Sequence, residues 1–224
     1  MIDYTDFTTH ARTSGLRGVI LARHGERPRI DPSDPTFGST LPLTAAGEAL
    51  ARSCGRALRG AGEPSEWTFG ASALRRTRLT AAYVAEEIGA DPAAVEDCAE
   101  VGIPGLWIED AALVHECQKR EGVKNYHERQ MRDGWADGFL PSAESARRVL
   151  EWIAGPAIRT RLAFFSTHDC HIGCLLNATG TASIRTDHWV GFLQGCAFLE
   201  QPDGTWKTEY IVPDKEHFEN LFVF

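Results

Sequence analysis

The chain has 224 residues, enough to bury the core of a single domain, and we take residues 1–224 as one domain. Hydrophobic residues make up 43% and charged residues 24%, which is ordinary globular usage and excludes disordered, collagen-like and low-complexity chains. The 31 acidic and 23 basic residues give a formal net charge of -8, and such a surface repels phosphate backbones, so no nucleic-acid partner is expected.

Neither a membrane span nor an export signal is visible. No stretch approaches the roughly 20 consecutive apolar residues that a bilayer requires. Residues 1–17 are polar and of mixed charge, so they lack the basic start and apolar centre of a secretory signal. We therefore predict a cytoplasmic protein with no membrane partner, whose six scattered cysteines stay reduced.

Short apolar runs alternate with helical patterns along the first part of the chain. Residues 18–22 predict a buried strand, and Thr44 opens a helix pattern that ends near Gly60. A second strand is predicted at 67–71, and a helix follows over 74–88. This alternation predicts parallel strands joined by helices.

The alternation breaks over residues 101–141, where glycines surround a charged helical stretch. We interpret this segment as an insertion that caps the active-site end of the sheet, although a solvated structural excursion is an equal alternative. Trp107 and Trp135 lie in it. They would either anchor the core or wall a substrate pocket.

The pattern resumes after the insertion. A helix is predicted from 142 to 153, and a third strand at 162–167 leads into another helix. Residues 192–200 and 206–212 predict an antiparallel hairpin. The expected fold is a three-layer α/β/α sandwich with a mainly parallel central sheet, an antiparallel edge hairpin and the insertion over the active site.

Unusual side chains follow each predicted parallel strand. The first strand leads into Arg23, His24 and Arg27, the second into Arg76, and the third into His168 and Asp169. Because ligands of such folds bind at the carboxyl ends of the strands, we expect these side chains to converge there. Guanidinium groups bind phosphate oxygens in pairs and offset the charge that develops during phosphoryl transfer. The set predicts an anion site suited to phosphate.

Two kinds of catalytic group accompany the arginines. A neutral imidazole can attack phosphorus and hold the phosphoryl group covalently, and either His24 or His168 could do so. A carboxylic acid can protonate the departing alkoxide and later deprotonate water. Asp169 and Glu100 are the candidates for that role.

Three motifs in this order resemble the histidine phosphatase (phosphoglycerate mutase-like) superfamily. They are RHGER at 23–27, S-x-x-x-R-T-x-x-T-A at 72–81 and STHD at 166–169, and the resemblance spans roughly residues 18–212. The resemblance implies that His24 is the phosphorylated nucleophile. It also implies a phosphate pocket formed by Arg23, Arg76 and His168.

The motifs are more similar to the acid-phosphatase branch of that superfamily than to its mutases. In that branch Arg27 would be an additional pocket arginine and Asp169 the proton donor, although Arg29 stands where the branch has a proline. In the mutase-like branch the donor is a glutamate, and Glu100 lies where it would fall. We prefer Asp169 to Glu100.

We therefore predict a metal-independent phosphomonoesterase without a cofactor, acting on a small phosphorylated metabolite through a covalent phosphohistidine. One alternative is a non-catalytic module that binds a phosphorylated ligand or phosphoprotein with the same arginine pocket. Another is a catalyst of a biosynthetic step on a phosphorylated metabolite. A zinc site among residues 168–174 is disfavoured because no second ligand pair is visible.

Overall fold

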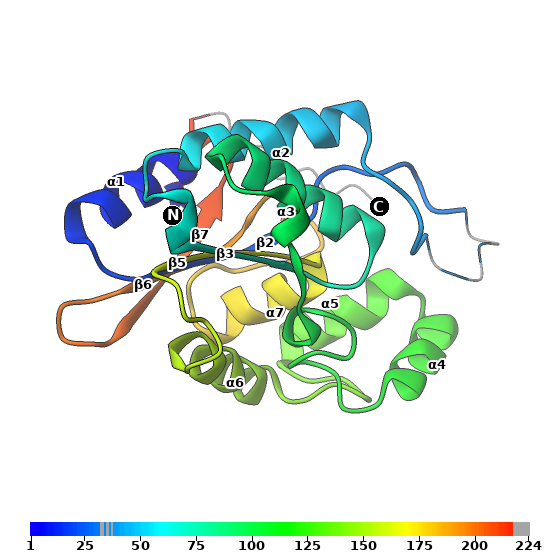
Figure 1. Ribbon diagram of the computed structural model, residues 1–224. Coiled ribbons are helices and arrows are strands. Elements are labelled where there is room, and N and C mark those ends of the chain that lie inside the picture. The colour runs from blue at the N-terminus through cyan, green and yellow to red at the C-terminus, as the bar shows by residue number, and fades with distance from the viewer. Residues whose placement is uncertain (32–33, 35, 37, 217–224) are drawn as a thin grey trace.

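The computed structural model describes residues 1–31, 34, 36 and 38–216, which form a layered α/β structure (Figure 1). Within these residues one sheet has the strand order β1-β7-β6-β2-β5-β3-β4. The strands are β1 (Ile2–Asp3), β2 (Gly18–Arg23), β3 (Trp67–Ala71), β4 (Glu96–Asp97), β5 (Leu162–Thr167), β6 (Gly195–Glu200) and β7 (Trp206–Val212). The helices are α1 (Tyr4–Ser14), α2 (Ala45–Leu58), α3 (Arg75–Ile88), α4 (Ala111–Glu121), α5 (Val123–Asp133), α6 (Ser142–Ala154) and α7 (Asp169–Ala178).

The three predicted parallel strands lie side by side at the centre of the sheet. β2 pairs in parallel with β5, where Arg23 lies opposite Thr167, and β5 pairs in parallel with β3, where Ala71 lies opposite Ser166. Every residue of β2 and β5 is buried, as expected for strands covered on both faces. This register brings the carboxyl ends of the three strands to one edge of the sheet.

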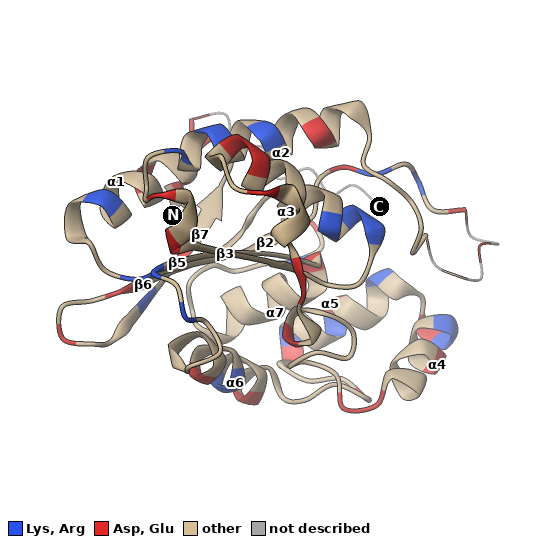
Figure 2. Ribbon diagram, in the orientation of Figure 1, with Lys and Arg blue, Asp and Glu red and all other residues tan. Residues whose placement is uncertain are grey.

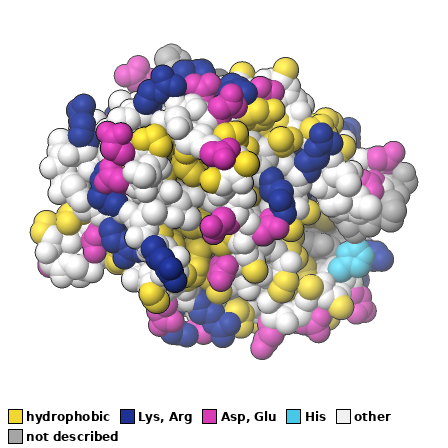
Figure 3. Space-filling view, in the orientation of Figure 1, with side chains coloured by type: hydrophobic (Ala, Val, Ile, Leu, Met, Phe, Trp, Pro, Cys, Tyr) yellow, Lys and Arg dark blue, Asp and Glu magenta, His cyan; other side chains and the backbone are white. Residues whose placement is uncertain are grey.

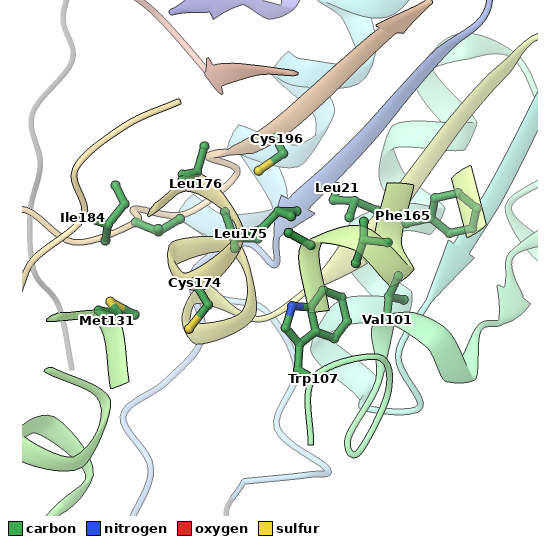
Figure 4. Close-up of a cluster of buried hydrophobic side chains, with 14 of the residues drawn as sticks. Leu21, Val101, Trp107, Met131, Phe165, Cys174, Leu175, Leu176, Ile184 and Cys196 are labelled. Carbon is green, nitrogen blue, oxygen red and sulfur yellow. The ribbon is translucent and has the colours of Figure 1, made fainter. Parts of the chain in front are cut away.

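Helices cover both faces of the sheet, so the predicted three-layer architecture is confirmed. In Figure 1, α1, α2 and α3 lie above the sheet, and α4 to α7 lie below it. Each face has its own buried apolar cluster. Figure 4 shows the cluster on the side of α7, where Leu175 faces Leu21 of β2. A fully buried leucine of this kind contributes about 1.5–3 kcal/mol to the free energy of unfolding.

The predicted antiparallel hairpin is formed by β6 and β7 and joins the parallel strands through an antiparallel pairing of β6 with β2. Outside this hairpin lies β1, a strand that the sequence did not predict. Its Ile2 pairs in parallel with Ile211 of β7. The sequence also did not predict α1. This helix starts at a capping box of Asp3 and Asp6 and packs Phe7 into the core.

The segment 101–141 supplies α4 and α5, of which α5 packs against α7. Trp107 is 1% exposed and stacks on His171 with ring centroids 4.4 Å apart, so it anchors the core. Trp135, in contrast, is 47% exposed. That this segment caps a substrate stays a prediction.

The exterior mixes acidic and basic side chains on the face seen in Figure 3. None of the helices in the described part of the chain combines the length and apolarity needed to cross a membrane. The cytoplasmic location stays a prediction.

Candidate active site

His24 lies directly after β2 with its imidazole buried at the carboxyl edge of the sheet. Its Nδ1 donates to the carbonyl of Gly25 at 2.7 Å, and its Nε2 accepts from Nε of Arg76 at 3.1 Å. Because an arginine only donates, this pairing requires a lone pair on Nε2. Burial, and next the charges of Arg23 and Arg76, hold the pKa of His24 well below its usual value. The ring is therefore neutral, with a nucleophilic nitrogen facing a guanidinium.

The backbone after His24 is fixed by close contacts with α2 and α3. The amide of Gly25 donates to Oγ1 of Thr80 at 2.9 Å, and the Thr44 hydroxyl donates to Oε2 of Glu26 at 2.6 Å. A Cβ on Gly47 would lie 2.2 Å from the carbonyl oxygen of Glu26. Glycine at position 47 is therefore what allows the nucleophile loop to approach the first turn of α2 this closely.

Arg23 is 3% exposed, and both ends of its guanidinium fork are held. Nη1 donates to the carbonyl of Val190 at 2.7 Å, and Nη2 forms an ion pair with Oδ2 of Asp169 at 3.0 Å. The guanidinium carbon also lies 4.3 Å from the ring centroid of Phe192. The Nε of Arg23 is buried and has no partner among the described residues, so it is available to an anion.

Arg76 and Arg27 complete a group of three guanidinium groups. Nη1 of Arg76 donates to the carbonyl of Gly38 at 2.9 Å. Burial, assisted by the charge of Arg27, lowers the pKa of Arg76 to about 10, so it remains charged at neutral pH. Burial and then the charge of Arg23 lower the pKa of Arg27, which places Arg27 beside the other two cations. Figure 2 shows that basic residues gather along the chain where α3 begins.

His168 faces His24 across the pocket, with ring centroids 5.9 Å apart. Its Nε2 lies 3.0 Å from the hydroxyl of Ser72, which is itself 2.9 Å from the Thr77 hydroxyl. Burial and the charge of Arg76 lower the pKa of His168 to about 3. Both imidazoles are therefore neutral at neutral pH and act as hydrogen-bonding groups or nucleophiles.

Asp169 begins α7, and its two oxygens accept two hydrogen bonds and form one ion pair. Oδ2 pairs with Nη2 of Arg23 and accepts from the indole of Trp189, each at 3.0 Å, and Oδ1 accepts from the amide of Cys170 at 2.9 Å. Burial opposes ionisation, but Arg23 and Trp189 outweigh it and hold the pKa of Asp169 well below its usual value. With three guanidinium groups and one carboxylate, the pocket carries two net positive charges, which matches a phosphomonoester dianion.

Glu100 lies in the 3₁₀ turn Ala99–Val101 at the same edge of the sheet. The turn is fixed by the Thr167 hydroxyl, which donates to the carbonyl of Val101 at 2.6 Å. The Glu100 carboxylate accepts from Sγ of Cys98 at 3.3 Å and lines a pocket of about 480 Å³. In the described part of the chain no contact joins it to His24. The structure thus brings together six of the seven predicted site residues, whereas the carboxylate of Glu100 contacts Cys98 and lines a pocket that none of the six lines.

Several residues that shape the site were not predicted. Ser72 has a signal in the sequence, because it opens the motif that contains Arg76. Trp189 and Phe192 have none, since they lie in a loop remote from the motifs. Val190 acts through its backbone carbonyl, which carries no side-chain signature.

One group of potential metal ligands is present in the described residues. Atoms of Cys117, Glu121 and Asp137 lie within 4.8 Å of one another. Arg129 forms ion pairs with both carboxylates and Arg120 forms another with Glu121, so their charge is already compensated. The sequence segment 168–174 forms no comparable group within the described part of the chain.

Comparisons with known proteins identify the family of this chain and structures with a similar fold. The family model of the histidine phosphatase superfamily (branch 1) matches residues 19–188. A mycobacterial glucosyl-3-phosphoglycerate phosphatase is similar in structure, with 16% identity, a TM-score of 0.52, and 87% of this chain and 98% of that chain covered. Bacillus stearothermophilus YhfR is 14% identical, with a TM-score of 0.53 and coverage of 86% and 95%. A search of curated protein sequences gave no match.

Proposed function

Because this chain belongs to the histidine phosphatase superfamily (branch 1), we propose that it is a metal-independent phosphomonoesterase that hydrolyses a small phosphorylated metabolite through a phosphohistidine at His24. The observation that carries the proposal is the lone pair of His24 Nε2, which lies 3.1 Å from Arg76 Nε in a pocket with two net positive charges. The family model is that of branch 1, so the expected closeness to the acid-phosphatase branch is not confirmed.

In the first step His24 Nε2 attacks phosphorus and the bond to the leaving oxygen breaks. The phosphoryl oxygens are held by Arg23, Arg27 and Arg76, whose charges stabilise the transition state. His168 forms a hydrogen bond with the phosphoryl group, and Ser72 fixes the orientation of the imidazole ring. The leaving alkoxide takes a proton from a carboxylic acid.

In the second step water attacks the phosphohistidine and the P–N bond breaks. The same carboxylate, now ionised, takes a proton from that water. Inorganic phosphate leaves and neutral His24 is restored, with its Nδ1 proton held throughout by the carbonyl of Gly25. No metal or cofactor enters either step.

The contacts of the two candidate carboxyl groups support a proposal for the proton donor. Asp169, preferred from the sequence, accepts two hydrogen bonds and forms an ion pair with Arg23, which hold its pKa well below the usual value and favour the ionised form at neutral pH. Glu100 accepts only from the Cys98 thiol among the contacts of the described residues. In the mutase-like pattern a glutamate supplies the proton, and this supports Glu100 as the donor.

The proposal is tested by hydrolysis of p-nitrophenyl phosphate with and without EDTA, comparing the wild type with His24→Ala. We expect turnover that resists EDTA and is lost in the variant, while His115→Ala on α4 serves as a control that keeps it. A stable ³²P label on the wild type after alkaline quenching, absent from His24→Ala, identifies the phosphohistidine. Phosphate binding without turnover on a panel of phosphorylated metabolites would instead identify the binding module.

A further inference from the structure

The loop between α7 and β6 contacts the phosphate pocket at two adjacent residues. The indole Nε1 of Trp189 donates to Oδ2 of Asp169 at 3.0 Å, and the carbonyl of Val190 accepts from Nη1 of Arg23 at 2.7 Å. Asp169 and Arg23 are themselves joined by the ion pair at 3.0 Å. The four residues therefore form a closed ring of polar contacts, which we call the Arg23 clamp.

The loop that completes the clamp is tied to the central sheet. Arg23 donates its backbone amide to the carbonyl of Gln194 at 2.8 Å, and its own carbonyl accepts from the amide of Leu193 at 3.1 Å. The side-chain oxygen of Gln194 accepts from Gly191 at 2.6 Å and from the Tyr210 hydroxyl at 2.5 Å. Trp189 is 2% exposed, so its ring is held by packing as well. The clamp is thus supported by buried structure rather than by mobile surface groups.

We propose that Asp169 and Trp189 are positioning residues that aim the Arg23 guanidinium at the phosphoryl group, and that neither transfers a proton. This inference rests on the proposed phosphatase function. Oδ2 of Asp169 pairs with Nη2 of Arg23 and compensates its positive charge. The N–H of Trp189 donates to the same oxygen and fixes its position. Trp189 and Val190 follow the last residue that the family model matches.

The physical benefit of the clamp is preorganisation. An arginine side chain has many rotamers, and a guanidinium that must be ordered during the reaction stabilises the transition state less than one already in place. With Nη1 and Nη2 occupied by Val190 and Asp169, the edge that contains Nε of Arg23 remains for the phosphoryl oxygens. Loss of the clamp should therefore weaken the binding of phosphate and of the transition state alike.

The dependence of the rate on the leaving group separates positioning from proton donation. An ester such as p-nitrophenyl phosphate departs without a proton, whereas an alkyl phosphate such as glycerol 2-phosphate needs one. We expect Asp169→Asn to lower kcat/KM by the same factor for both esters and to weaken competitive inhibition by inorganic phosphate. Glu100→Gln should affect the alkyl ester far more than the nitrophenyl ester.

Trp189→Phe keeps an aromatic side chain but removes the N–H together with the five-membered ring of the indole, so the control must be another tryptophan shortened in the same way. Loss of one hydrogen bond to a charged group predicts a decrease of about tenfold in kcat/KM for both esters. Trp206→Phe, on β7, is the matched control and should leave both values unchanged. The proposal is overturned if Trp189→Phe equals the wild type, or if Asp169→Asn loses only the alkyl ester.

The failure of the proposed function would look different. If the wild type hydrolyses neither these esters nor any member of the panel of phosphorylated metabolites, phosphohistidine catalysis is contradicted, and the clamp is then judged by calorimetric binding of inorganic phosphate to the same variants. Weaker phosphate binding by Asp169→Asn and Trp189→Phe supports positioning of Arg23, and unchanged binding refutes it.

Discussion

Replacing His171 with phenylalanine should change the free energy of unfolding little at pH 8 and should stabilise the protein as the pH falls. His171 is 1% exposed, neither of its ring nitrogens has a partner among the described residues, and its ring lies parallel to Trp107 at 3°. Burial, followed by the charges of His168 and His127, holds the pKa of His171 well below its usual value. The folded protein therefore keeps this ring neutral, while the unfolded chain protonates it.

The sign and size follow from proton linkage. Above the unfolded pKa near 6.5 the ring is neutral in both states, and below it only the unfolded chain gains the proton, so stability is lost as the pH falls. At pH 5 the loss due to one such histidine is about 2 kcal/mol, which His171→Phe removes. At pH 8 the histidine is neutral in both states, so only its unpartnered nitrogens and the size of the new ring affect the free energy of unfolding. Removing the nitrogens should stabilise the folded protein by about 1–3 kcal/mol, and the larger phenyl ring should cost roughly 1–2 kcal/mol.

The assay is urea unfolding of the wild type and His171→Phe at pH 8 and at pH 5, followed by tryptophan fluorescence. The free-energy difference between the two proteins should increase by about 2 kcal/mol from the first pH to the second. An equal difference at both pH values would refute the reasoning, because it would mean that the folded protein protonates His171 as easily as the unfolded chain.

Three further substitutions test the site and its support. Arg76→Lys removes the guanidinium group that donates to both His24 and Gly38. We expect kcat/KM for p-nitrophenyl phosphate to fall by about 10- to 100-fold, and a decrease below twofold would show that these two hydrogen bonds are not needed for catalysis. Gly47→Ala should displace the loop after His24 and lower kcat in the same assay, and unchanged kcat would show that the close approach is unnecessary. Gly55→Ala brings a Cβ to 2.9 Å from the carbonyl oxygen of Val84 and should cost about 1–3 kcal/mol in urea unfolding, whereas wild-type stability would show that α2 and α3 separate easily.

The parts of the fold that the sequence predicted are those whose signal is local. Residues 18–22 and 162–167 are apolar runs of strand length, and both are fully buried strands. The helix α1 was missed because residues 4–14 are polar on average, although Tyr4 and Phe7 mark its buried side and Asp3 caps it. A pattern of three apolar positions is easily hidden when most of a helix faces water.

The sequence predicted those site residues that belong to the three motifs. Arg23, His24 and His168 stand at strand ends and Arg76 in the helix that follows β3, and parallel pairing brings those strand ends together. The charge state of Asp169 could not be predicted, because it depends on contacts with residues far away in sequence. Trp189 reaches it from a loop whose path is decided by tertiary packing.

The position of β2 between β5 and β6 has a consequence for synthesis of the chain. Both neighbours of this apolar strand come from beyond residue 161, so a ribosome releases β2 long before either partner exists. Until then its edges are open to other chains, and early intermediates should depend on rapid completion or on chaperones to avoid aggregation. Because Arg23 ends β2 and His168 follows β5, phosphate binding reports on the pairing of these two strands and can serve as a readout for refolding kinetics.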